Sequence, residues 1–292
     1  MKEKVKQYLE WKGTYALRAS VNYKIWLDRF IQVCGDKPIE EYSISDYVKY
    51  KHWIENHFSP YCVMYATIVI KNFFRFYRDQ NFICLSPSFI KLPHVTAKSH
   101  RAVTEEEFNK TIEGIPENNF RSLRDLLLIR LLWDTGVRVS ELCDLDISQI
   151  NEKKHSAVIR TKKTGNQRII VWSEDTNHLL MKYMGMRLEL NHVNHASALF
   201  ITWTKQDGWS YRVTTRTIQR IIKIYVNGAG INEKITPHSF RHGWAHKRRD
   251  QNAPLAFIQR GLGHLNPIST FIYEQYNDNE FVNHANSYLH VA

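Results

Sequence analysis

The sequence predicts a mainly α-helical protein with a small β component, divided into two domains. Its 292 residues exceed the roughly 100–200 residues of a typical single domain. Apolar residues recur at helical spacing in the first part of the chain, and two short strand patterns occur only later. We therefore expect a helical domain over residues 1–95, a linker over 96–101, a mixed domain over 102–278 and a tail over 279–292.

The first domain is predicted to contain three or four helices. Breaks at Gly35–Pro38 and Ser59-Pro60 separate two groups of apolar and aromatic side chains that follow the helical period. We expect most of these side chains to form the core. The groups are Tyr15, Leu17, Val21, Ile25, Trp26 and Phe30, followed by Ile68, Ile70, Phe73, Phe74 and Tyr77.

A linker is predicted next, because Ser86-Pro87 and Leu92-Pro93 disfavour a continuous helix and residues 94–101 lack apolar periodicity. Thr104 followed by Glu107 then forms a capping box, in which the two side chains satisfy backbone N–H groups at a helix start. A new helix should begin here.

The second domain is predicted to combine helices with one β-hairpin. An apolar helix is expected from Arg124 to Thr135, and two strands over 157–160 and 168–171 flank a turn at 163–166. Further helices are expected over 214–226, after Thr236-Pro237 and after Asn266-Pro267, since proline in the first helical turn loses no hydrogen bond.

Composition limits the possible functions. A formal net charge of +11 favours a polyanionic partner, usually nucleic acid, over a basic surface that has no dedicated partner. The 43% hydrophobic content excludes a mainly disordered chain. We expect no membrane span and no signal peptide, since no stretch approaches roughly 20 apolar residues. The four cysteines lack metal-ligand spacing and are typical of reduced thiols in the cytosol: Cys34, Cys62, Cys84 and Cys143.

The segment from Thr236 to His246 carries the clearest chemical pattern. His238, Arg241 and His242 are spaced to share one helix face. A metal site is the alternative, because histidine recurs every four residues through His246, but Ser239 stands where a zinc protease needs glutamate. Imidazoles with a guanidinium suit an anion such as phosphate better.

Two more segments complete the pattern. Residues 135–142, Thr-Gly-Val-Arg-Val-Ser-Glu-Leu, place Arg138 three residues before Glu141, and His264 follows Gly261-Leu262-Gly263. Tyr273 comes nine residues after His264. Two lysines, Lys162 and Lys163, lie at the turn of the predicted hairpin. Together with these lysines and the Thr236–His246 segment, the ordered motifs resemble the tyrosine recombinase, or phage integrase, family over roughly residues 100–280.

The resemblance implies a helical core-binding, SAM-like domain followed by an α+β catalytic domain. It also implies that Tyr273 attacks a DNA phosphodiester and forms a 3′-phosphotyrosine. Arg138, Arg241 and His264 would bind the phosphate, and His238 would exchange a proton with the phenol. A hairpin lysine would protonate the leaving 5′-oxygen; Lys163 fits better than Lys162.

Supporting roles are implied for Glu141, which would orient Arg138, and for His242. Tyr276, three residues after Tyr273, is the alternative nucleophile. Six basic residues are candidates for contacts with the DNA backbone rather than for catalysis: Lys71, Arg75, Arg160, Arg168, Arg248 and Arg249.

The resemblance further implies double-stranded DNA as substrate, a homotetramer on paired DNA sites, possible accessory proteins, and a reaction without metal, ATP or another cofactor. The protein would be cytoplasmic and bound to the nucleoid. The tail over 279–292 could dock on a neighbouring protomer or on its own domain. A type IB topoisomerase, an inactive DNA-binding relative and a zinc hydrolase are the alternatives.

Overall fold

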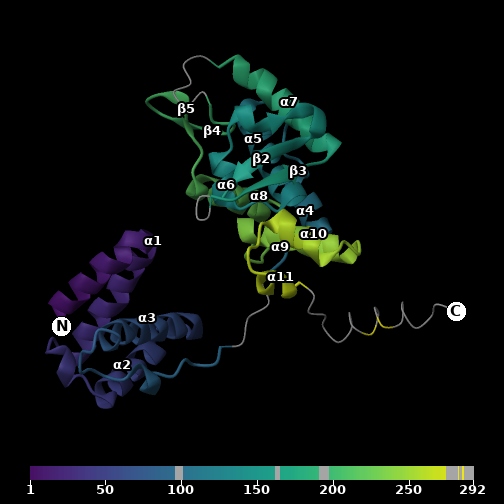
Figure 1. Ribbon diagram of the computed structural model, residues 1–292. Coiled ribbons are helices and arrows are strands. Elements are labelled where there is room, and N and C mark those ends of the chain that lie inside the picture. The colour runs from purple at the N-terminus through teal and green to yellow at the C-terminus, as the bar shows by residue number, and fades with distance from the viewer. Residues whose placement is uncertain (96–100, 162–164, 191–196, 274–281, 283–284, 286–292) are drawn as a thin grey trace. The chain divides into compact units, whose positions relative to one another are not determined.

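The computed structural model describes residues 1–95, 101–161, 165–190, 197–273, 282 and 285 (Figure 1). The chain divides into two compact units, Met1–Lys98 and Ser99–Ala292. Helices dominate both units, and the strands that the structure describes form a three-stranded and a two-stranded sheet. The predicted fold class, mainly α-helical with a small β component, is confirmed. Among the described residues, no helix is long and apolar enough to cross a membrane.

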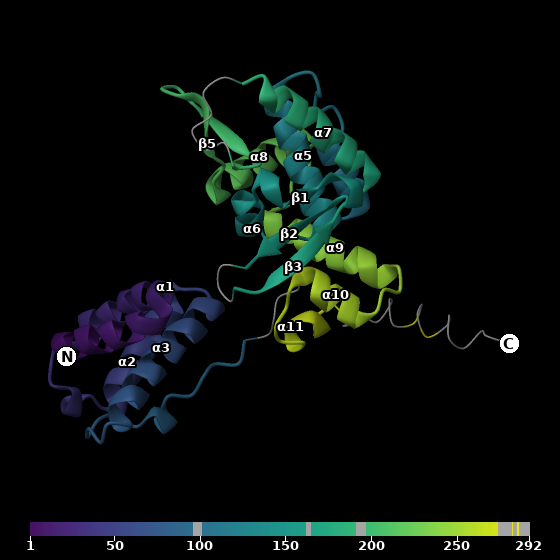
Figure 2. The same ribbon diagram turned by 45° about the horizontal axis from the view of Figure 1, so that its top comes forward.

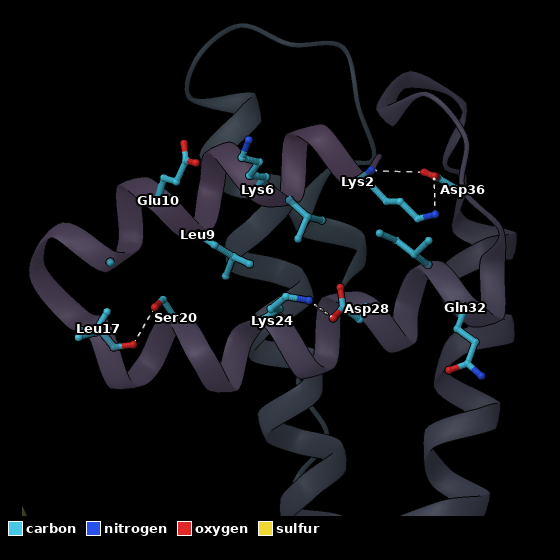
Figure 3. Close-up of a pocket in the computed structure, with 13 residues that line it drawn as sticks. Lys2, Lys6, Leu9, Glu10, Leu17, Ser20, Lys24, Asp28, Gln32 and Asp36 are labelled. Carbon is cyan, nitrogen blue, oxygen red and sulfur yellow. Dashed lines mark hydrogen bonds and ion pairs between the residues drawn. The ribbon is translucent and has the colours of Figure 1, made fainter.

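The first unit contains helices α1 (Lys2–Cys34), α2 (Ile44–His57) and α3 (Pro60–Arg78). Helix α1 is interrupted at Ala16, whose φ of −147° and ψ of 58° are not helical. Figure 3 shows the two arms of α1 lying side by side, with a partly apolar groove between them. The backbone N–H of Lys2 donates to Asp36 Oδ1 at 3.3 Å, which holds the two ends of α1 together.

The core of the first unit agrees with only part of the sequence analysis. The aromatic side chains of α3 at Phe73, Phe74 and Tyr77 are buried, as expected. In the earlier group Trp26 and Phe30 are buried, but the other four side chains are exposed, so the expectation of a core role is wrong for them. They are Tyr15, Leu17, Val21 and Ile25. The second arm of α1 has two apolar stripes, and periodicity alone does not indicate which of them faces the core.

The second unit is organised around helix α5 (Phe120–Thr135), which is buried on nearly all sides and packs against α7 (Glu174–Leu188) and α9 (Pro237–Asp250). The apolar residues of α5 occur on every face, which is typical of a helix that other elements enclose. The remaining helices are α4 (Glu105–Ile112), α6 (Val139–Asp144), α8 (Thr215–Gly228), α10 (Leu255–Leu262) and α11 (Ile268–Phe271).

The predicted hairpin is present. Strands β1 (Ile150–Asn151), β2 (Ser156–Arg160) and β3 (Gln167–Val171) form an antiparallel sheet in the order β1-β2-β3, with Val158 opposite Ile169. One face packs into the core through Ala157, Ile159 and Ile170. A second hairpin, β4 (Ile201–Thr204) with β5 (Gly208–Arg212), was not predicted from the sequence.

Helix starts follow the predicted caps, but the helix after Pro267 is shorter than expected. Thr104 Oγ1 accepts a hydrogen bond from the Glu107 N–H at 3.2 Å, and α9 begins at Pro237. Helix α11 ends at Phe271. Tyr273 therefore lies just beyond it and not on a longer helix, and Tyr276 lies outside the described residues.

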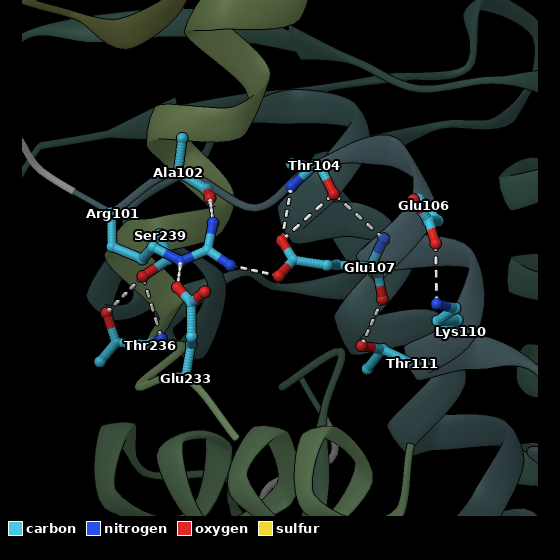
Figure 4. A network of polar contacts seen from close by, with 10 residues as sticks. All are labelled: Arg101, Ala102, Thr104, Glu106, Glu107, Lys110, Thr111, Glu233, Thr236 and Ser239. Carbon is cyan, nitrogen blue, oxygen red and sulfur yellow. Dashed lines mark hydrogen bonds and ion pairs between the residues drawn. The ribbon is translucent and has the colours of Figure 1, made fainter. Parts of the chain in front are cut away.

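A short segment, residues 101–104, packs across α9 (Figure 4). The Val103 N–H donates to the Ser239 carbonyl at 3.0 Å, and Arg101 forms ion pairs with Glu107 and Glu233. A Cβ added at Gly243 would lie 2.4 Å from the Val103 carbonyl oxygen. The close approach of this segment to α9 therefore requires glycine at position 243.

We expect Gly243→Ala to lower the free energy of unfolding by about 1–3 kcal/mol, because the added methyl group must displace backbone. Gly185, inside α7 with no atom within 4 Å of its added Cβ, is the matched control. Gly185→Ala should raise stability by about 0.5–1 kcal/mol. Thermal unfolding should show the two midpoints moving in opposite directions. A Gly243→Ala midpoint at or above that of the wild type would contradict the packing argument.

Candidate active site

The structure gathers most of the motif residues in one part of the second unit. The start of α6, the β2–β3 hairpin, α9 and the segment from α10 to Tyr273 all contribute. Together these elements form a cluster of guanidinium groups around one carboxylate, next to an imidazole and a phenol. The residues of the cluster are Arg138, Glu141, Arg168, Arg241, His264 and Tyr273.

Glu141 is the carboxylate of this set and is 5% exposed. Its Oε2 accepts from the Arg138 backbone N–H at 2.9 Å, and its Oε1 accepts from the Arg138 guanidinium at 3.1 Å. Thr161, the residue after β2, donates its hydroxyl proton to Oε1 at 3.0 Å. Burial opposes ionisation, but the hydrogen bonds and charges of Arg168 and Arg138 lower the pKa of Glu141 to about 2. The carboxylate is therefore charged at neutral pH and joins α6 to the hairpin.

Arg168 is the largest departure from the sequence analysis. It was a candidate for a DNA contact, but its side chain is buried and donates to both Glu141 oxygens, at 2.8 and 2.9 Å. Its Nε donates to the Gly261 carbonyl at 3.0 Å. A guanidinium committed to these partners does not face solvent, so we withdraw the DNA-contact assignment.

Arg241 is buried in the middle of α9. Its guanidinium donates to the Gly136 carbonyl at 2.7 Å and to the Leu262 carbonyl at 2.5 Å. These two carbonyls belong to the glycine-containing segments that precede Arg138 and His264. Burial, followed by repulsion from Arg138 and Arg168, lowers the pKa of Arg241 to about 9. An anion placed beside this guanidinium would relieve the repulsion.

The glycines of the motifs make room for Trp244. Its indole N–H donates to the Asp134 carbonyl at 2.8 Å. A Cβ at Gly136 would lie 3.0 Å from the indole, and one at Gly261 would lie 2.3 Å from it. Gly136 also has a φ of +57°, which ends α5 in the left-handed conformation. The Trp244 indole thus sets the spacing between the Gly136 and Gly261–Leu262 segments, whose carbonyls accept from Arg241.

His264 lies directly after the left-handed Gly263, which ends α10. Its Nδ1 is 2.8 Å from Thr270 Oγ1, and its backbone N–H donates to the Gln259 carbonyl at 3.1 Å. Burial, followed by the charges of Arg241, Arg138 and Arg168, lowers the pKa of His264 to about 4. The ring is therefore neutral at physiological pH and can donate a hydrogen bond without adding charge.

Tyr273 is 2% exposed and packs with Trp244, Ile258 and Leu262. Its hydroxyl lies 2.8 Å from His242 Nδ1. Burial raises the pKa of the phenol, and the charges of Arg241 and Arg138 oppose this rise. The phenol is thus protonated in the unliganded protein and has a hydrogen-bonding imidazole beside it.

The histidines of α9 differ from expectation. His242, expected only to support the site, hydrogen-bonds to the Tyr273 hydroxyl. His238, expected to exchange a proton with the phenol, lies on the first turn of α9 and is exposed. His246 meets the Tyr273 ring edge-on at 5.6 Å between centroids. In the parts of the chain that the structure describes, no group of three His, Cys, Asp or Glu side chains could hold a metal ion.

The remaining predicted residues have varied positions, and one of them contacts the site: the Arg249 guanidinium donates to the Tyr273 carbonyl at 3.4 Å. Lys162 and Lys163 fall outside the described residues, between Thr161 and Gly165, whose backbones are joined by a 2.8 Å hydrogen bond. Arg160 is exposed on β2, and Lys71 and Arg75 lie on α3, Lys71 half-buried and Arg75 exposed. At the end of α9, Arg248 packs over the Trp244 ring and Arg249 pairs with Asp250.

This arrangement can bind an anion and activate a phenol. Three guanidinium groups face one carboxylate, so the site has an excess of positive charge. A phosphate diester supplies a compensating negative charge and oxygens that accept from guanidinium N–H groups. The phenol of Tyr273 is a nucleophile on which the charges of Arg241 and Arg138 act.

The match to known proteins covers most of the chain. The phage integrase family model matches residues 101–280. The tyrosine recombinase XerA of Pyrococcus furiosus is 34% identical over 183 residues, which are 63% of this chain and 59% of XerA. The match therefore spans less than two thirds of that relative. The probable integrase/recombinase protein MJ0367 of Methanocaldococcus jannaschii is 30% identical over 263 residues, covering 86% of this chain and 77% of MJ0367.

Solved structures share the fold. A crystal structure of XerA recombinase is 25% identical, with a TM-score of 0.55 and 98% coverage of both chains. The XerH site-specific recombinase, in a post-cleavage complex with its palindromic difH substrate, has a TM-score of 0.74 at 17% identity. That match covers 96% of this chain and 83% of XerH.

The burial of His264 among cations predicts its titration. Since its pKa is lowered to about 4, the ring should stay neutral from pH 8 down to about pH 5, whereas an ordinary histidine titrates near 6.5. Nitrogen-15 NMR of the ring nitrogens would measure this, with His264→Gln used to assign the signal. A midpoint near 6.5 would show that the ring is not desolvated beside the arginines.

Proposed function

The chain belongs to the phage integrase family, and from this membership we propose that it is a site-specific DNA recombinase. It would cut and rejoin duplex DNA through a 3′-phosphotyrosine, without metal or ATP. The observation that carries the proposal is the phenol of Tyr273, which hydrogen-bonds to His242 next to the charges of Arg241 and Arg138.

In the proposed reaction, the Tyr273 oxygen attacks the phosphorus and displaces the 5′-oxygen of the next nucleotide. The bond energy is kept in the phosphotyrosine ester, so resealing by the 5′-hydroxyl needs no outside energy. The proton of the phenol passes first to His242 Nδ1, 2.8 Å away. His238, four residues earlier on the same helix, is a second acid–base group in this proposal.

The arginines would stabilise the transition state. Arg138 and Arg241 donate to the nonbridging oxygens, where negative charge increases as the fifth bond to phosphorus forms. Arg241 is already fixed by two carbonyls, so it needs little reorganisation when the phosphate arrives. Neutral His264 donates a further hydrogen bond. We propose Lys163, with Lys162 as the alternative, as the proton donor to the leaving 5′-oxygen.

A basic stripe on α8 supports a DNA-binding role. Arg216, Arg220 and Lys223 are exposed and line a shallow groove with Thr214 and Thr217. Their spacing of four and three residues places them on one helix face. This stripe was not among the predicted DNA contacts, although its basic residues follow the helical period in the sequence. We propose that it contacts the phosphate backbone, together with Arg160, Lys71, Arg75 and Arg248. The Arg249 side chain is 10% exposed and donates to Asp250 and to the Tyr273 carbonyl, so it is left out of this proposal.

We propose that the protein acts as a homotetramer on paired DNA sites, in the cytoplasm at the nucleoid, with or without accessory proteins. An apolar groove between β3, α9 and α10 supports this assembly. It includes Ile169, Val171 and Phe257, each more than half exposed. The tail over 279–292 lies outside the described residues except at Val282 and Ala285, and its Phe281, Tyr288 and Leu289 could fill such a groove on a neighbouring protomer.

Tyr273→Phe should abolish covalent attachment to DNA, because phenylalanine lacks the attacking oxygen. Nicked duplexes carrying the sequences that flank the gene would be incubated with protein and run on a denaturing gel. Wild type and the matched control Tyr276→Phe should give a DNA-dependent, protease-sensitive adduct. An adduct retained by Tyr273→Phe would refute the assigned nucleophile. Joint products between two sites, rather than relaxed circles alone, would distinguish recombination from topoisomerase activity.

Phe257→Asp, and separately deletion of residues 279–292, should prevent tetramers from forming on two paired sites while binding of one protomer to one site persists. The charge would disfavour an apolar segment in the groove. Leu188→Asp, at an exposed apolar position at the end of α7, is the control and should assemble normally. Light scattering of the DNA complexes would measure their mass. Intact tetramers from the deletion variant would exclude the tail as the docking segment.

A further inference from the structure

We propose that Arg168 is a positioning residue for the cleavage step. It joins the β2–β3 hairpin, the Glu141 carboxylate and the Gly261–His264 segment, and thereby holds Arg138 and His264 in a fixed relation. This inference rests on the proposed recombinase function.

The contacts of Arg168 involve all three nitrogens of its guanidinium. Its two terminal nitrogens donate to Glu141 Oε1 and Oε2 at 2.8 and 2.9 Å, in a bidentate pair. The third, Nε, donates to the Gly261 carbonyl at 3.0 Å. The planar group therefore links three segments that lie far apart in the sequence.

The same carboxylate also binds Arg138. Glu141 Oε1 accepts from the Arg138 guanidinium, and Oε2 accepts from the Arg138 N–H. A carboxylate held by one contact could turn about its last side-chain bond. Arg168 binds both oxygens, alongside the Arg138 N–H and the Thr161 hydroxyl, and so helps to fix the carboxylate to which the Arg138 side chain donates.

Gly263 shows how closely Arg168 approaches the residue before His264. A Cβ at Gly263 would lie 2.9 Å from an Arg168 terminal nitrogen and 3.0 Å from its Cδ. Gly263 also has a φ of +63°, a conformation that favours glycine. The guanidinium packs against the backbone at the point where α10 ends and the chain turns into His264.

Charge and shape make separable contributions at this position. Arg168 adds one positive charge near Arg241 and His264, and it is among the causes that lower the pKa of both groups. A lysine would keep this charge but could not form the bidentate pair and reach Gly261 at once. If Arg168 acts by positioning, the loss of cleavage activity in Arg168→Lys should therefore be nearly as large as in Arg168→Gln.

The test is single-turnover cleavage of nicked DNA at saturating protein, with the dissociation constant for DNA measured separately. We expect Arg168→Lys and Arg168→Gln to slow adduct formation roughly 10- to 100-fold, the effect of small misplacements in active sites, while the dissociation constant stays within about twofold. Arg121→Lys, at an exposed position on α5, should cleave as wild type does. Ile170→Val, a change on β3 in the buried hydrophobic core, controls for loss of stability.

A double-mutant cycle identifies the path through Glu141. In a Glu141→Gln background, Arg168→Lys should have less than about a threefold further effect, because the shared contact is already lost. Fully additive losses of cleavage rate in the double mutant, or normal cleavage by Arg168→Lys, would overturn this inference but not the proposed function. An equal slowing by Ile170→Val would overturn it as well, by showing a general response to destabilisation. A wild type that forms no adduct while it binds DNA would instead overturn the proposed function and this inference with it.

Discussion

The site depends on one buried carboxylate among several fixed positive charges. Without Glu141, Arg138, Arg168 and Arg241 would repel one another in a region largely closed to water, where such repulsion is strong. With it, the three arginines can be packed close together, yet the balance stays positive. In the proposed function, the phosphate of the DNA would match the remaining positive charge. The protein supplies only part of the negative charge that its arginines need, and the substrate would supply the rest.

Much of this arrangement could be predicted from the sequence. The motif glycines, the histidine helix and the hairpin each have a local signal, and the structure has α5, α9 and β2–β3 where those signals lie. The elements that were missed lack such a signal. The β4–β5 hairpin has the sequences Ile-Thr-Trp-Thr and Gly-Trp-Ser-Tyr-Arg, which lack the adjacent aliphatic β-branched residues that indicated β2 and β3. The break at Ala16 carries no proline or glycine at the break itself.

The site was less predictable than the fold, for a physical reason. Arg168 and Arg160 lie on neighbouring strands and look alike in sequence, but the pleat of the hairpin turns one toward Glu141 and leaves the other exposed. Similarly, His238 and His242 share a helix, and only the position of Tyr273 makes His242 its partner. Such assignments depend on contacts between distant segments, which a motif does not encode.

The hydrogen bond between Tyr273 and His242 also bears on the direction of the proposed reaction. In the proposed reaction the phenol donates to His242 Nδ1 before it attacks. Once the phenol oxygen is esterified it has no proton to donate, so the protonated imidazole would be the donor. The proton that leaves during cutting is then stored beside the oxygen that needs it for resealing. By microscopic reversibility, cleavage and rejoining use the same groups in opposite order. The site itself therefore favours neither direction, and the outcome is set by which DNA end occupies the site when the strand is resealed.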